Sequence, residues 1–96
     1  MKRPEVVSKR GGYKPLDGDV YVGRPSQWGN TFVIGKDGDR DEVIEKYRAA
    51  LTPQLVADLA RATPQRLVCW CRPPEGFQGR LLCHAQILAD ALEAMP

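Results

Sequence analysis

Two clusters of residues in the 96-residue sequence have the types and the spacing that chemistry requires. The first is GRPSQWGN (23–30), in which Arg24 supplies a planar guanidinium suited to phosphate or carboxylate. In the same cluster the Trp28 indole could stack on a base or a sugar, and the Asn30 amide could pair with a base edge. The second cluster is CWC followed by CH, within residues 69–84. We therefore look for function in these two clusters.

The second cluster combines three cysteines with the only histidine of the chain. Side chains alternate along a strand, so Cys69 and Cys71 share one face of the β-prone run that contains them. Cys83 and His84 stand at the start of a predicted helix and are the candidates for catalysis. Open α/β sheets bind ligands beyond the carboxyl ends of their strands, against helix N-termini. We therefore expect a ligand-binding site at that edge, made of Arg24, Trp28, Asn30 and Cys71.

Three chemical interpretations of the second cluster remain open. Cys69, Cys71, Cys83 and His84 have the side-chain types of a zinc site, but the usual spacing is C-x₂₋₄-C, and neighbouring helical residues diverge by roughly 100°. Alternatively, a helix N-terminus favours a reactive thiolate at Cys83, although no partner base is evident. In the third interpretation the cysteines are small core residues and the histidine makes a structural hydrogen bond. We expect reduced, metal-free thiols, with Cys83 the most reactive if solvent reaches it, and keep zinc as the alternative cofactor.

The first cluster also has a purely structural interpretation. Trp28 would then lie in the core, Asn30 in a turn and Arg24 in an ion pair. The cluster matches neither the P-loop nor the G-x-G-x-x-G pattern, so no standard nucleotide motif is present.

Composition predicts one ordinary domain. Hydrophobic residues make up 43% and charged residues 27% of the chain, and three cysteines do not suggest a disulfide framework. No apolar run approaches the roughly 20 residues needed to span a bilayer, and the N-terminus lacks the apolar stretch of a secretory signal. We expect a cytoplasmic protein with no membrane partner. The net charge of +2 is weak, but residues 1–14 are rich in Lys and Arg and form a basic N-terminal arm or an edge strand.

The order of predicted elements indicates the fold. β-prone runs cover 5–9, 19–23 and 66–71, with a further short strand expected at 31–35. Hydrophobic periodicity predicts three helices, over about 40–51, 53–62 and 83–94. Capping signals precede the first two, namely Asp39 with Glu42, and Thr52 with Pro53. We therefore expect an α/β fold with a small three- to four-stranded sheet, at least partly parallel, flanked by about three helices.

Taken together, VYVGRPSQWGNTF (20–32), LVCWCRP (67–73) and CHAQIL (83–88) resemble the DUF4326 family. This is a group of small uncharacterised domains of phages and bacteria, and the resemblance covers roughly residues 19–90. The chain departs from the family pattern at Thr31 and Ala85, where the family usually has proline and glycine, and in a longer segment between Cys71 and Cys83. The hallmark residues that the resemblance implies are Gly23, Arg24, Trp28, Gly29, Asn30, Phe32, Cys69, Trp70, Cys71, Cys83 and His84.

Our leading functional expectation is a phage-type α/β domain with a small polar site for a phosphorylated or nucleotide-like ligand. The first alternative is a non-catalytic module that binds a host protein and whose motifs are structural. The second is nucleic-acid binding through the basic N-terminal arm, which salt would weaken. If the chain is phage-encoded, its compartment would be the host cytoplasm. Whether it is an enzyme stays open at this stage.

Overall fold

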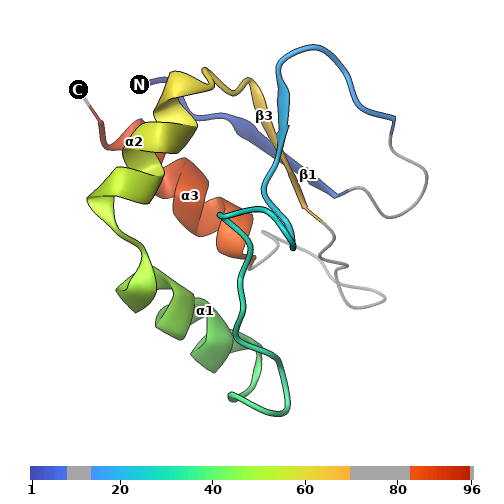
Figure 1. Cartoon of the computed structure of the whole chain (residues 1–96), viewed down its shortest axis with the longest axis vertical. Helices are drawn as coiled ribbons and strands as arrows, with labels where there is room; N and C mark the ends of the chain where they lie inside the picture. The colour runs from blue at the N-terminus through green and yellow to red at the C-terminus, as the bar shows by residue number, and fades with distance from the viewer. Residues whose placement is uncertain (9–13, 70–82, 96) are drawn as a thin grey trace.

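The computed structural model describes residues 1–8, 14–69 and 83–95. Its centre is a sheet of three parallel strands in the order β1-β3-β2, drawn in Figure 1. Val6 and Val20 both lie opposite Leu67, so the two outer strands are in register with the central one. The strands are β1 (Glu5–Ser8), β2 (Asp19–Tyr21) and β3 (Arg66–Cys69).

Three helices complete the fold and confirm the predicted α/β class. They are α1 (Arg40–Ala50), α2 (Pro53–Arg61) and α3 (His84–Glu93). α3 contacts β1 and β3, and both α1 and α2 contact α3 (Figure 1). α3 is thus the helix that joins the sheet to the rest of the protein.

The capping signals in the sequence start the helices where they were expected. Asp39 and Glu42 form a reciprocal capping box at α1, and the Thr52 hydroxyl accepts the Leu55 amide at α2. These bonds satisfy amide groups that have no partner inside the helix. Cys83 takes the same position before α3, with its sulfur accepting the amide of Ala85.

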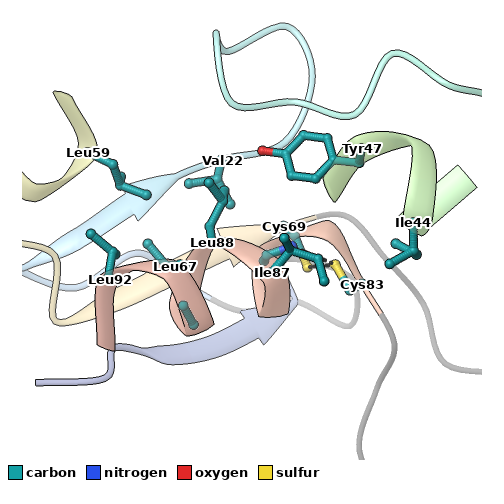
Figure 2. Packing of buried hydrophobic residues seen from close by; sticks show 12 residues of the cluster. Val22, Ile44, Tyr47, Leu59, Leu67, Cys69, Cys83, Ile87, Leu88 and Leu92 are labelled. Atoms are coloured by element: carbon teal, nitrogen blue, oxygen red, sulfur yellow. Dashed lines mark hydrogen bonds between the residues drawn. The ribbon is translucent and has the colours of Figure 1, made fainter. Parts of the chain in front are cut away.

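The core lies between the sheet and α3, as Figure 2 shows. Leu67 and Cys69 alternate with Val68 along β3, and only the first two belong to the main core cluster. On α3, Leu88 and Leu92 are fully buried. Each such leucine contributes roughly 1.5–3 kcal/mol of hydrophobic stabilisation. This packing fixes where α3 begins, and hence where the CH pair lies.

The strand expected at 31–35 is wrong. In the structure the Phe32 amide donates to the Asn30 side chain, and the Val33 amide donates to a carboxylate oxygen of Asp37. These local bonds occupy amides that a sheet ladder would need, so the apolar residues of this segment form a turn. The predicted strand endings at 70–71 lie outside the described residues.

The first residues of the chain are tied to its end. The amino group of Met1 donates to the Met95 carbonyl, and the Arg3 guanidinium bonds both Asp90 and Gln86. Residues 5–8 then form the edge strand β1. Within the described parts of the chain, no helix has the length and apolar character needed to cross a membrane.

Candidate functional site at the carboxyl edge of the sheet

His84 links the second cluster to the residue that precedes the first. Its Nε2 lies 2.8 Å from the carbonyl oxygen of Val22, the residue directly before GRPSQWGN. A carbonyl oxygen can only accept a hydrogen bond, so Nε2 carries the proton and Nδ1 presents its lone pair. Segments 62 residues apart in the sequence are therefore joined at the carboxyl edge of the sheet.

The environment of His84 keeps its ring neutral. The side chain is 5% exposed, and this burial lowers its pKa below the ordinary value of 6.5. The bond to Val22 and the electrostatic interaction with Cys69 oppose that shift, while the positive charge of Arg24 adds to it. Arg24 is thus one of the charged groups that disfavour a protonated imidazole.

The two described cysteines form a buried sulfur pair. Cys69 and Cys83 are both 0% exposed, and their Sγ atoms are 3.6 Å apart (Figure 2). Cys83 Sγ also lies 3.7 Å from His84 Nδ1. The high reactivity expected for Cys83 depended on solvent access at the start of its helix, and the structure does not provide that access.

The zinc alternative remains untested. Cys71, one of its four proposed ligands, lies outside the described residues, as does its predicted place in the ligand site. The residues that the structure does describe contain no group of three or more His, Cys, Asp or Glu that could hold a metal ion.

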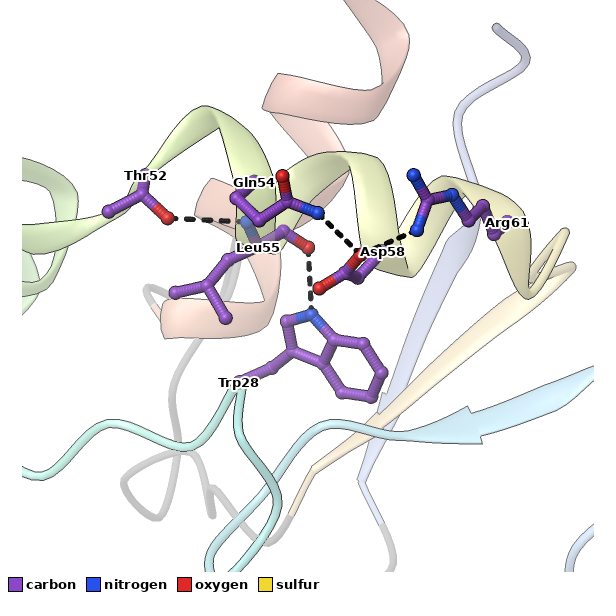
Figure 3. A network of polar contacts seen from close by, with 6 residues as sticks. All are labelled: Trp28, Thr52, Gln54, Leu55, Asp58 and Arg61. Carbon is purple, nitrogen blue, oxygen red and sulfur yellow. Dashed lines mark hydrogen bonds and ion pairs between the residues drawn. The ribbon is translucent and has the colours of Figure 1, made fainter.

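Trp28 is anchored to the helices. Its indole N–H donates to the Leu55 carbonyl of α2 over 2.9 Å (Figure 3). Its own carbonyl accepts the Tyr47 hydroxyl of α1 over 2.7 Å. The polar groups of Trp28 thus hold the loop in place, and its predicted contact with a ligand would have to come from the ring face.

Asn30 has a similar structural role. Its amide nitrogen lies 3.3 Å from the Val43 carbonyl of α1, while its oxygen accepts the Phe32 amide. Both ends of the side chain therefore have partners in the protein. A role in reading a ligand would have to use the second N–H or the second lone pair of this amide.

Sequence reasoning missed Tyr47 as a residue of this site. Its ring meets His84 edge-on, with the ring centroids 5.2 Å apart and the planes at 72°. Burial, and secondarily the electrostatic interaction with Cys83, raises the pKa of the phenol, so it stays a neutral donor. Hydrophobic periodicity places Tyr47 on the inner face of a helix. A site residue and an ordinary core residue give the same periodicity, so the pattern could not identify its role.

Two consecutive turns present Arg24. The Ser26 amide donates to the Gly23 carbonyl over 2.9 Å, across a cis peptide between Arg24 and Pro25. The Gly29 amide then donates to the Ser26 carbonyl over 3.0 Å. A Cβ at Gly29 would lie 2.9 Å from the Arg24 backbone nitrogen, so only glycine permits this close packing.

The Arg24 side chain itself is exposed. Among the described residues, none forms a hydrogen bond or ion pair with its guanidinium. The structural alternative for Arg24, an ion pair, is therefore not found within these residues. The arrangement places an exposed cation on the loop that follows β2.

A comparison with protein families supports the resemblance found in the sequence. The family model described as "Domain of unknown function (DUF4326)" matches residues 6–94. No curated protein and no solved structure matches the chain.

Proposed function

We propose a function for this chain, which belongs to the DUF4326 family. The proposal rests on the chain's own residues. The domain binds a phosphorylated or nucleotide-like ligand at the carboxyl edge of its sheet. The observation that carries this proposal is the exposed Arg24 guanidinium, which has no partner among the described residues and is presented by a tightly packed turn.

The surroundings of Arg24 suit an anion. α3 begins at the same edge, and the N-terminus of a helix carries partial positive charge, while the Ala85 and Gln86 amides are already bonded to the Cys83 sulfur and carbonyl. The first turn of α3 contains no acidic residue that would compete for that charge. Arginine adds a planar fork that matches two phosphate oxygens. Phosphate is thus the ligand group that this edge would bind best.

The buried thiols favour binding over thiol catalysis. A nucleophile must reach its substrate, whereas Cys69 and Cys83 are both 0% exposed. In this proposal the sulfur pair and His84 are buried residues that hold the structure of the site, and Arg24 contacts the ligand.

A second candidate function is the non-catalytic interaction module. It is favoured by the internal bonds of Trp28 and Asn30, which give both hallmark residues a structural role. In that case Arg24 would be a surface contact for a host protein, and phosphate compounds would not bind.

The test is a calorimetric titration of inorganic phosphate, a nucleoside monophosphate and a nucleoside diphosphate into the protein. Arg24→Gln removes the guanidinium, and a hydrogen bond to a charged group contributes about 1.5–3 kcal/mol. We therefore expect Arg24→Gln to weaken binding roughly ten- to hundredfold.

Arg61→Gln is the matched control. Arg61 is an exposed arginine of α2 with 74% of its side chain accessible, so its loss changes the net charge equally. We expect this variant to bind like the wild type. Equal loss in both variants would mean nonspecific charge attraction, and absence of binding by the wild type would favour the interaction module.

A further inference from the structure

We propose that Cys69 and Cys83 are an oxidation site, in which a small peroxide converts the two thiols into a disulfide that links the end of β3 to the start of α3. Their Sγ atoms are 3.6 Å apart. A disulfide bond is about 2.05 Å long, so the sulfurs need to approach by roughly 1.5 Å.

The backbone positions of the two residues suit such a closure. Cys69 is the last residue of β3, and Cys83 is the N-cap of α3 with extended backbone angles (φ −146, ψ 152). Both residues therefore lie at the ends of elements, where a small adjustment does not disturb a helical turn. Figure 2 shows their side chains pointing toward one another.

The polar neighbours of Cys83 favour a thiolate at that sulfur. The Ala85 amide donates to Cys83 Sγ over 3.5 Å, a contact that suits a sulfur with negative charge. The lone pair of His84 Nδ1 is 3.7 Å from the same sulfur, because Nε2 is committed to Val22. Cys83 is therefore the sulfur that attacks, and Cys69 is the one that resolves.

The reaction is balanced with hydrogen peroxide as the oxidant. Cys83 sulfur attacks one peroxide oxygen, the O–O bond breaks, and the departing hydroxide takes the thiol proton to form water. This leaves a sulfenic acid on Cys83. Cys69 sulfur then attacks that sulfur, the S–S bond forms, and hydroxide leaves with the Cys69 proton as a second water. The two thiols lose two electrons and two protons in total.

Burial predicts that the site selects oxidants by size. With both residues 0% exposed, an oxidant reaches the sulfurs only when the structure opens locally, and hydrogen peroxide needs a smaller opening than an aromatic disulfide reagent. We expect hydrogen peroxide to form the bond in the folded protein while 5,5′-dithiobis(2-nitrobenzoate) reacts at least tenfold more slowly than it does with the unfolded chain.

Peptide mapping tests the proposal. The protein is treated with hydrogen peroxide, alkylated and cut with trypsin, which leaves Arg72–Pro73 intact and so yields residues 67–80 and 81–96. We expect these two peptides to be joined, with a combined mass lower by two hydrogens. Since 67–80 contains both Cys69 and Cys71, the experiment is repeated in Cys71→Ser, where the link must persist.

Cys83→Ser is the matched negative control. Serine is a good N-cap, so α3 should start at the same residue and the reduced variant should fold. The wild type should gain several degrees in its thermal midpoint on oxidation and lose them with dithiothreitol, whereas Cys83→Ser should show no such change. Loss of the link in folded Cys71→Ser, or a stoichiometric zinc ion that protects all thiols from peroxide, would overturn the proposal.

Discussion

The His84 imidazole is 5% exposed and donates to Val22 through Nε2, so the folded protein holds it in the neutral form. Charging this ring would place a cation in the core, which burial and the positive charge of Arg24 both disfavour. Its role is to join the two clusters and to present Nδ1 to Cys83. The sequence predicted that this histidine begins a helix. It could not predict the hydrogen-bond partner, because Val22 lies 62 residues away along the chain.

A pH dependence of stability follows from His84. Its pKa is about 6.5 in the unfolded chain and lower in the folded protein. Between these two values only the unfolded state binds the proton, so the free energy of unfolding decreases as the pH falls below about 6.5. One proton limits this slope to about 1.4 kcal/mol per pH unit. Urea unfolding between about pH 7 and 5.5, above the usual range of carboxylates, measures it.

His84→Gln is the control for this effect. Glutamine can still donate to the Val22 carbonyl but does not titrate, and the chain has no other histidine. The variant should therefore lose the slope in this pH range. An unchanged slope in His84→Gln would show that another group is responsible.

Hydrogen bonds attach the first cluster to two helices. α1 holds the loop through the Tyr47 hydroxyl and through the Val43 carbonyl that accepts from Asn30, and α2 holds it through the Leu55 carbonyl that accepts from Trp28. Because α1 and α2 also contact α3, the helices carry the position of the loop to the rest of the core.

Tyr47→Phe should therefore weaken both stability and ligand binding. It removes a partly buried bond of 2.7 Å while keeping the ring against His84. A net loss of about 0.5–1.5 kcal/mol in the free energy of unfolding is expected. Tyr21→Phe removes a comparable but exposed bond, to the Arg24 carbonyl, and should cost less. Chemical denaturation of both variants decides this, and a larger loss in Tyr21→Phe would contradict the account.

The elements differed in how well the sequence predicted them. α1 and α2 could be predicted because their caps are local: Asp39 with Glu42, and Thr52 with Pro53, act within one turn. The strand at 31–35 failed for the same physical reason, since side chains within a few residues captured its amides. Local chemistry decided both outcomes.

The candidate site was predictable only in part. Both clusters were expected to follow strands and so to reach the same edge, and the His84–Val22 bond joins them there. The burial of the cysteines, the anchoring of Trp28 and the participation of Tyr47 depend on how three helices pack, which no local pattern encodes. Arg24 was predicted from the sequence as a ligand-binding residue, and the structure shows that its side chain is exposed.

At the scale of the whole molecule, the two edges of the sheet differ. The amino edge has a cavity of about 600 Å³, lined by residues that include Lys2, Arg3 and Arg66. Its two arginines are already paired, Arg3 with Asp90 and Arg66 with Asp19. The carboxyl edge instead presents Arg24, which has no such pair among the described residues. We therefore expect an anion to bind at the carboxyl edge and not at the amino edge.

The most direct test is to locate phosphate on the folded protein by nuclear magnetic resonance. A nucleoside monophosphate is titrated into ¹⁵N-labelled protein, and shifts of the backbone amides are followed. Our account predicts saturable shifts at residues 24–29, around Arg24, and in the first turn of α3, which begins at the same edge of the sheet. Shifts confined to the amino edge around Lys2 and Arg66, or no saturable shift at millimolar ligand, would contradict it.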